Sequence, residues 1–227
     1  SSGMPTEGKE VLVGSGTFLV DRARGLEKLM RFALPDPAWG VLSLLRFAAA
    51  SGAERFSVER GAKGELSVRF GGTPPTRDQL ERPYDALFAK AARGEARGRD
   101  LAVGLLSLLR LEPAHILVRA GHGPERLQLR LNRADPEAVE AAHAAERDTL
   151  MRFYPGPRTP AGAWSGLAEA FDRRCAMADL ELSLDGERRA LRPPERQDGR
   201  PLRGPDVRGW VGVPERFLPE SRLEVYR

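Results

Sequence analysis

The sequence predicts an α+β fold, a two-layer α/β sandwich in which one mixed sheet carries helices on one face. The order of the elements is the first observation: two helices, a hairpin, two more helices and a second hairpin. The second is that the helix beginning at Pro37 and the helix over residues 101–111 are apolar on nearly all sides, so both belong inside a domain. The 227 residues are 41% hydrophobic and 30% charged, which is enough to bury a core. A small α+β segment is expected at the C-terminal end.

Composition and charge narrow the classes of function. The formal net charge is only +4, and acidic residues are interspersed with the basic ones throughout the chain. This argues against nucleic-acid binding, because such an interface needs basic residues clustered on one face. A single cysteine, Cys175, excludes an intrachain disulfide and fits a reducing compartment. There is neither a signal peptide nor an apolar run of membrane-spanning length, so we expect a cytoplasmic protein with no membrane partner.

The N-terminal part predicts a tail and two helices. Residues 1–15 form the tail, and their first three residues are typical of a cleaved tag. Residues 16–33 carry apolar side chains at helical spacing. Asp36-Pro37 then supplies an N-cap followed by proline at the first helical position. Gly52 is placed to close that second helix as a left-handed cap.

A hairpin and a third helix come next. Alternating apolar residues predict strands over residues 55–59 and 65–70, joined by a glycine-containing turn. Thr76 and Gln79 have the spacing of a capping box, which predicts a helix from there to about Ala92.

A fourth helix and a second hairpin complete the core. Residues 91–99 predict a polar loop, and the apolar helix over residues 101–111 is ended by Pro113. Strands over residues 115–120 and 126–131 follow. Together with an alanine- and glutamate-rich helix from Asp135 to about Met151, these elements form an expected domain over residues 16–153.

The C-terminal segment, residues 164–227, is expected beyond a proline- and glycine-containing linker at residues 154–163. Its expected elements are a helix over residues 164–177, a strand over 180–184, a turn at Asp185-Gly186, an arginine-rich loop over 188–208, and strands over 210–213 and 223–226. The chain end directly after a strand suggests a fragment of a longer protein.

Residues 16–131 resemble the nucleotide-binding domain of the Bergerat-fold or GHKL superfamily, which includes DNA gyrase B, the ninety-kilodalton heat-shock chaperones, histidine kinases and MutL mismatch-repair proteins. Leu42–Glu59 looks like the family's first motif, and Ser51-Gly52-Ala53 matches its D-A-G-A end. Leu101–Leu108 is similar to the chaperones' glycine motif, with Gly104 on the second glycine. The resemblance implies a sandwich of Bergerat type. It also implies that residues 164–227 begin a transducer-like domain, which in the family couples nucleotide state to partners.

The departures from the family pattern fall on the nucleotide-binding positions. In the family a glutamate activates the attacking water and an asparagine holds Mg²⁺. These positions align with Ser43 and Phe47, and neither residue can do that chemistry. The adenine-reading aspartate aligns with Phe70, which Gly71 and Gly72 follow. The phosphate lid is reduced to scattered glycines and arginines, namely Gly94, Gly98, Gly104, Arg93, Arg97 and Arg99.

These departures leave two interpretations open, besides a misplaced alignment. In the first, the former pocket is packed core, because Phe47 and Phe70 lie where a ligand would sit and aromatic groups that fill a cavity stabilise a domain. In the second, a pocket of altered specificity remains, in which Arg93, Arg97 and Arg99 grip an anionic ligand. In either case we expect no family-type catalytic residue.

The leading hypothesis is a catalytically inactive GHKL-like module that acts through protein–protein interaction, as a regulatory or scaffold part of a larger bacterial protein. Its partner would be another protein or another domain of the parent chain, and no cofactor is expected. The alternative is a divergent ATP-binding chaperone- or MutL-like ATPase, which would need ATP and Mg²⁺. A second alternative is nucleic-acid binding through the arginine-rich loop over residues 188–208.

Other catalytic and metal-binding patterns do not occur. His115, His122 and His143 are scattered along the chain and, with one cysteine, give no metal-ligand spacing, so no metal site is expected. The sequence contains neither a nucleophile motif of the form G-x-S-x-G nor a P-loop.

Overall fold

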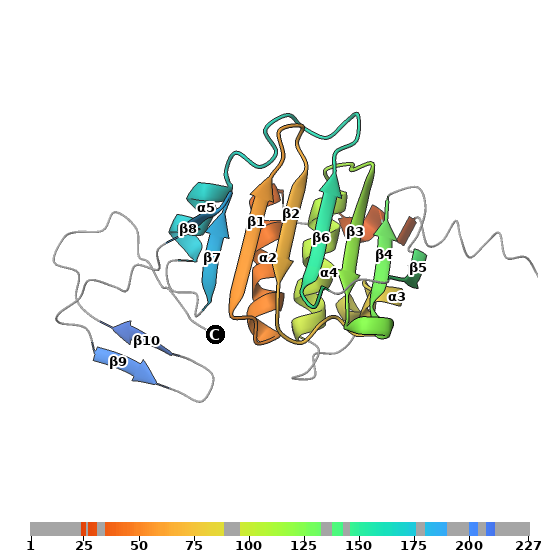
Figure 1. Ribbon diagram of the computed structural model, residues 1–227. Helices are drawn as coiled ribbons and strands as arrows, with labels where there is room; N and C mark the ends of the chain where they lie inside the picture. The colour runs from red at the N-terminus through yellow and green to blue at the C-terminus, as the bar shows by residue number, and fades with distance from the viewer. Residues whose placement is uncertain are drawn as a thin grey trace, which may run out of the picture.

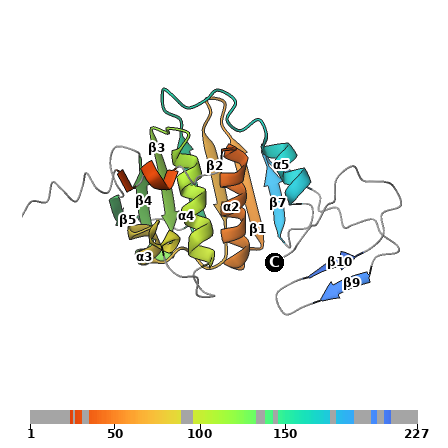
Figure 2. The same cartoon turned by 180° about the vertical axis from the view of Figure 1, so that it is seen from behind.

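The protein is a two-layer α/β sandwich. An eight-stranded mixed sheet, in the order β5-β4-β3-β6-β2-β1-β7-β8, forms one layer, and helices cover one of its faces (Figures 1 and 2). This confirms the fold class predicted from the sequence. The computed structural model describes residues 24, 25, 27–30, 35–88, 96–132, 138–142, 146–175, 180–189, 200–203 and 208–211.

The helical layer contains α2 (Pro37–Ala50), α3 (Arg77–Glu81), α4 (Ala96–Leu109) and α5 (Leu167–Arg174), with a 3₁₀ turn at Asp85–Leu87. A second 3₁₀ turn, Gly123–Glu125, lies in the connection between the third and fourth strands. The sheet contains β1 (Arg55–Arg60), β2 (Leu66–Phe70), β3 (His115–Ala120), β4 (Leu127–Leu131), β5 (Ala138–Ala141), β6 (Thr149–Tyr154), β7 (Glu181–Leu184) and β8 (Glu187–Arg189). A separate antiparallel pair is formed by β9 (Arg200–Arg203) and β10 (Arg208–Val211).

The ends of α2 form as the sequence predicts. The Asp36 side chain accepts a hydrogen bond from the Ala38 amide at 2.9 Å, and Pro37 occupies the first turn. Gly52 has φ +74 and closes the helix, while the Ala53 amide donates to the Ala48 carbonyl. Both signals lie in the local sequence, which is why they could be read without knowing the fold.

The core lies between the sheet and the helices α2 and α4. Alternate residues of each strand point toward the helices and are buried, because the side chains of a strand alternate between its two faces. The buried inward residues of the strands include Phe56, Val58, Leu66, Val68, Phe70, Ile116, Val118, Leu129, Met151, Phe153, Leu182 and Leu184.

The two helices α2 and α4 approach each other closely at a pair of glycines. A Cβ on Gly40 would lie 2.9 Å from Cβ of Ser107, and one on Gly104 would lie 2.8 Å from Cδ2 of Leu44. Such contacts are shorter than packed side chains allow, so glycine is required at both positions for this helix separation.

The expected helix from Asp135 to about Met151 is wrong. Residues 138–141 form β5, and Thr149–Tyr154 form β6, a central strand that pairs with β2 on one side and β3 on the other. Alanine and glutamate favour a helix, but the position between two strands supplies partners for the backbone groups on both edges of β6. The alternation of Thr149, Met151 and Phe153 with Leu150 and Arg152 fits this strand.

The third and fourth helices have different limits from those predicted. The capping box forms, since the Thr76 and Gln79 side chains each bond the other residue's backbone amide, but α3 ends at Glu81. Pro83 lacks an amide hydrogen and clashes with the preceding turn, which prevents the helix from continuing. In the expected loop over residues 91–99, residues 96–99 already belong to α4.

The structure joins the two segments that the sequence analysis separates. Strand β7 pairs in parallel with β1, and the predicted turn at Asp185-Gly186 leads into β8, so the C-terminal segment extends the main sheet. The Asp185 carboxylate accepts hydrogen bonds from the Arg60 backbone amide at 2.8 Å and from its guanidinium at 2.6 and 2.8 Å. Trp164, the first residue of the expected C-terminal segment, donates its indole N–H to the Gly64 carbonyl at 2.8 Å.

Several predicted elements lie partly or wholly outside the described residues. Of the expected helix over residues 16–33, residues 24, 25 and 27–30 are described, and they are helical. Most of the arginine-rich loop and the expected strand over residues 223–226 lie outside. Strand β10 covers part of the strand expected over residues 210–213.

Candidate functional site

The candidate site lies where α2 and β2 end and α4 begins, at one end of the sandwich (Figure 1). Phe47 of α2 meets Phe70 of β2 edge to face, with ring centres 5.9 Å apart and planes at 73°. Phe70 also stacks on Phe56 of β1 at 5.7 Å. All three side chains are at most 1% exposed. Phe47 and Phe70, which were expected at a nucleotide site only from the sequence resemblance, are therefore packed against each other.

Arg97 of α4 covers this aromatic cluster. Its guanidinium carbon lies 4.6 Å from the centre of the Phe47 ring, within the range of a cation–π interaction. Its Nε donates to Oγ of Ser51 at 2.7 Å, and one terminal nitrogen donates to the carbonyls of Thr73 and Pro74, both at 2.6 Å. Burial lowers the pKa of the Arg97 guanidinium, but an arginine stays protonated in proteins. Arg97 thus links α4 to the end of α2 and to the loop after β2.

Ser51 and Gly72 complete the same junction. The Ser51 hydroxyl donates to the Phe47 carbonyl at 2.6 Å, and the Ser51 carbonyl accepts from the Thr73 amide at 2.7 Å. Gly72 has φ +77, and a Cβ there would overlap the Ser51 carbonyl and lie 2.8 Å from the Ala53 nitrogen. Only glycine permits the loop to approach the end of α2 this closely.

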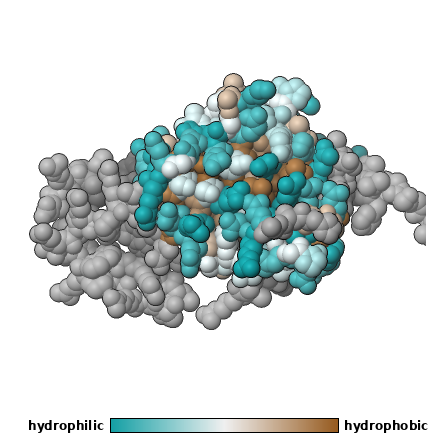
Figure 3. All heavy atoms as spheres, in the orientation of Figure 1, coloured by the Kyte–Doolittle hydropathy of each residue, from teal (hydrophilic) through white to brown (hydrophobic). Residues whose placement is uncertain are grey.

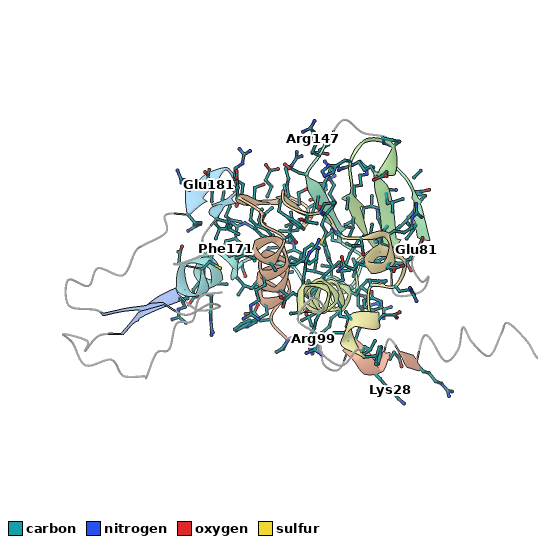
Figure 4. All side chains as sticks on the ribbon, turned by 90° about the horizontal axis from the view of Figure 1, so that it is seen from below. Lys28, Glu81, Arg99, Arg147, Phe171 and Glu181 are labelled. Carbon is teal, nitrogen blue, oxygen red and sulfur yellow. The ribbon has the colours of Figure 1, made fainter. Side chains whose placement is uncertain are left out.

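The remaining candidate residues lie elsewhere or serve packing. The Ser43 side chain is buried, and its hydroxyl donates to the Trp39 carbonyl one turn earlier in α2 at 3.0 Å. Gly104 forms the close contact with α2 described above. Arg99 is exposed, on the side of α4 that faces away from the sheet (Figure 4). Arg93 lies outside the described residues. The structure therefore brings together Phe47, Phe70, Gly72 and Arg97.

A fully buried cation, Arg126, was not singled out by the sequence analysis. Its side chain is 0% exposed, and its terminal nitrogens donate to the carbonyls of Gly121 at 3.1 Å, Glu146 at 2.7 Å and Asp148 at 3.0 Å. Burial lowers its pKa, and the Glu146 carboxylate, whose Oε2 lies 3.6 Å from it, acts in the opposite direction. These contacts fix the segment that leads into β6. Nothing in the local sequence distinguishes Arg126 from the other arginines.

The cysteine, histidine and carboxylate side chains are the remaining groups that could act as nucleophiles or metal ligands. The Cys175 side chain is buried, and this burial raises the pKa of its thiol to about 12, so little thiolate forms near neutral pH. In the described ranges, no three histidine, cysteine, aspartate or glutamate side chains are grouped to hold a metal ion. His115 and His122 lie on β3 and in the turn after it, and His143 is outside the described residues.

No helix in the described part of the chain is long and apolar enough to cross a membrane. A scan against models of known protein families finds no match for this chain. A search of curated proteins also finds no match.

Proposed function

We propose that the chain is a catalytically inactive GHKL-like module that works by binding another protein or another domain, as a regulatory or scaffold part of a cytoplasmic bacterial protein. One observation carries this proposal: the packing of Phe47, Phe70 and Arg97 at positions where the resemblance would place nucleotide contacts. The resemblance itself is part of the proposal.

The packing leaves these groups little capacity to bind a nucleotide. The Phe47 and Phe70 rings contact each other rather than a void, and neither can accept a hydrogen bond from an adenine amino group or ligate Mg²⁺. Arg97 directs its Nε and one terminal nitrogen to acceptors of the protein. A phosphate would have to compete with the Ser51 hydroxyl and two backbone carbonyls for these donors.

Opening the site would carry a high free-energy cost. Removing a buried phenylalanine side chain from a core costs roughly 3–5 kcal/mol. Displacing the Phe47 ring to admit a ligand would lose a comparable amount of packing. Each 1.4 kcal/mol weakens binding about tenfold, so the penalty corresponds to roughly a hundred- to several-thousand-fold in affinity. This supports a module whose activity does not depend on ATP.

The experiment is a titration of the full chain with a fluorescent ATP analogue, with and without Mg²⁺, together with a phosphate-release assay. We expect no saturable, Mg²⁺-dependent binding up to millimolar nucleotide and no phosphate release above the protein-free rate. Saturable Mg²⁺-dependent binding would contradict the proposal and favour a divergent ATPase.

A second experiment addresses the partner. Proteins retained from a bacterial extract by the immobilised chain are compared with and without ATP and Mg²⁺. We expect the same proteins under both conditions. Retention that changes with ATP would contradict an ATP-independent scaffold.

A further inference from the structure

The face of the sheet that points away from the helices has a composition of its own. We define the open face as the outward residues of the four neighbouring strands β2, β6, β3 and β4. This face points toward the viewer in Figure 1. The strand registers place ten residues there, in chain order Ser67, Arg69, His115, Leu117, Arg119, Gln128, Arg130, Leu150, Arg152 and Tyr154. All described helices lie on the other face (Figures 2 and 4).

The open face is basic. Each of its four strands contributes one arginine, and none of these outward positions holds an aspartate or glutamate; the arginines are Arg69, Arg119, Arg130 and Arg152. Arg147, just before β6, is exposed and lies on the same side of the sheet (Figure 4). Flanking carboxylates offset part of this charge: Glu146 pairs with Arg69, and Glu140 of β5 accepts from Gln128. The interspersed acidic residues of the sequence thus do not prevent clustering of arginines here.

The arginines alternate with apolar side chains across the strands. The register sets Arg119, Leu150 and Arg69 side by side in one row, and Arg130, Leu117 and Arg152 in the next. Neighbouring strands are about 4.8 Å apart, so each row holds two cations roughly 10 Å apart. The apolar side chain between them is half-buried at Leu117 and buried at Leu150, which is only 4% exposed. Figure 3 shows hydrophilic residues with hydrophobic ones between them on this face.

An aromatic pair lies at the end of the face away from Arg69. His115 of β3 and Tyr154 of β6 are direct neighbours in the register, and their rings stack with centres 4.4 Å apart and planes at 26°. Both side chains are half-buried and therefore reachable from solvent. Burial and the charge of Arg130 lower the pKa of His115, which favours its neutral ring at neutral pH. The outward residues of β6 are, in chain order, Leu150, Arg152 and Tyr154.

We propose that the open face binds single-stranded RNA, with Arg69, Arg119, Arg130 and Arg152 along its phosphates and the His115–Tyr154 pair stacking on an unpaired base. A sheet face with arginine and aromatic side chains matches unpaired bases and their backbone, because single-stranded RNA is recognised by stacking on aromatic rings and guanidinium planes. A duplex hides its base faces, and an acidic peptide would gain little from the aromatic pair. This surface is on the opposite side of the sheet from Phe47 and Arg97, so the inference does not rest on the proposed function.

The first test measures fluorescence anisotropy of the full chain with a labelled 12-nucleotide single-stranded RNA of mixed sequence, over a range of salt concentrations. The comparison probes are single-stranded DNA of the same sequence, the RNA duplex and a poly-glutamate peptide. We expect the single-stranded RNA to bind most tightly and its affinity to fall as salt rises. Failure to bind, or tighter binding of the duplex or of poly-glutamate, would overturn the proposal. Equal affinity for single-stranded DNA would overturn the choice of RNA.

The second test uses arginine variants. Arg130 and Arg152 are exposed, and removing both charges in the variant Arg130→Gln/Arg152→Gln should weaken RNA binding at least tenfold and reduce the salt slope by roughly 1.4. The matched control is Arg77→Gln/Arg82→Gln, which removes two exposed arginines at α3 in the helical layer. An equal loss in both double variants would contradict a site on the open face.

The third test separates stacking from charge. Tyr154→Leu keeps an apolar side chain but removes the ring, and we expect a loss of roughly tenfold with an unchanged salt slope. Circular dichroism and thermal unfolding check that this variant folds. If it does not, Arg130→Glu reverses an exposed charge without touching the core, and it should weaken binding more than Arg130→Gln does. Unchanged binding in a folded Tyr154→Leu variant would overturn the role of the aromatic pair.

Discussion

The guanidinium of Arg97 lies 4.6 Å from the centre of the Phe47 ring and is held there by hydrogen bonds to the end of α2 and to the loop after β2. One side chain thus joins the start of α4 to two segments that are distant in sequence. The position that could have contacted a ligand acts as a structural link between elements of the same domain.

Replacing Arg97 should therefore lower stability. Arg97→Ala leaves the Ser51 hydroxyl and the carbonyls of Thr73 and Pro74 without this donor and exposes the Phe47 ring. We expect a loss of roughly 1–3 kcal/mol in the free energy of unfolding, measured by urea denaturation. The control Arg99→Ala, at an exposed position two residues away, should change it by no more than about 0.5 kcal/mol. Equal effects of both variants would argue against the link.

Phe47 should behave as a core residue. Phe47→Ala removes a fully buried ring that contacts Phe70, and we expect it to cost roughly 3–5 kcal/mol. The control is Phe88→Ala, since Phe88 is 71% exposed and its loss should cost about 0.5 kcal/mol or less. Chemical denaturation of the two variants gives the comparison. A small effect at Phe47 would show that its ring lines a space that is not filled.

Alanine variants of Gly72 and Gly186 distinguish the cost of a left-handed backbone from the cost of steric overlap. Both have positive φ, +77 and +80, but a Cβ on Gly186 meets nothing within 4 Å, whereas one on Gly72 overlaps the Ser51 carbonyl. Gly186→Ala should cost only the left-handed backbone penalty of roughly 1–2 kcal/mol. We expect Gly72→Ala to cost clearly more, because the loop must also move away from α2. Similar losses in the two denaturation curves would show that the loop is free to move.

The contact between Arg60 and Asp185 should make stability depend on pH. Burial tends to raise the pKa of Asp185, but the hydrogen bonds and charge of Arg60 outweigh it, so the pKa lies below the ordinary 3.8. The stabilisation is therefore complete above that ordinary value and is lost as the pH falls through the lower pKa of the folded state. Asp185→Asn, which tolerates the positive φ of this position, should be less stable than the wild type at pH 7.

The test of this contact compares urea denaturation of the wild type and Asp185→Asn at pH 7 and at successively lower pH. We expect the difference between the two proteins to shrink once the pH falls below the ordinary aspartate pKa. A difference that stays constant down to strongly acidic pH would show that ionised Asp185 does not stabilise the fold.

The sequence predicts those features that are decided locally. The N-cap at Asp36, the glycine closure at Gly52 and the capping box at Thr76 each depend on residues within one helical turn, and all three form. The two hairpins also follow from local alternation and turn residues. The two-layer arrangement was predicted from the helix that begins at Pro37 and the helix over residues 101–111, because both are apolar on nearly all sides.

The features that the sequence analysis missed depend on distant partners. Strand β6 directly follows an alanine- and glutamate-rich stretch, and its position is set by pairing with β2 and β3. The joining of β7 to β1 depends in the same way on a contact between Asp185 and Arg60 across the chain. Pro83, which ends α3, is a local signal that could have been used.

At the candidate site, the sequence analysis named both aromatic residues, Phe47 and Phe70. It did not predict which arginine contacts them. Arg93, Arg97 and Arg99 were all expected at an anionic ligand under one interpretation, since all three alternate with glycine in one segment. Arg97 and Arg99 are two residues apart in a helix, so their side chains point in different directions. Arg97 reaches Ser51, whereas Arg99 is exposed. Predicting these directions requires knowing that both residues are helical, but the sequence analysis placed the start of α4 five residues too late, at residue 101 instead of Ala96.

The central claim, that the site is filled and independent of nucleotide, is tested most directly by thermal unfolding of the full chain with and without millimolar ATP or ADP, each with and without Mg²⁺. A ligand at a hundred times its Kd adds about 2.7 kcal/mol to stability, which raises the unfolding midpoint by several degrees. We predict an unchanged midpoint under all conditions. A rise of several degrees that requires Mg²⁺ would contradict the account and identify a nucleotide-binding protein.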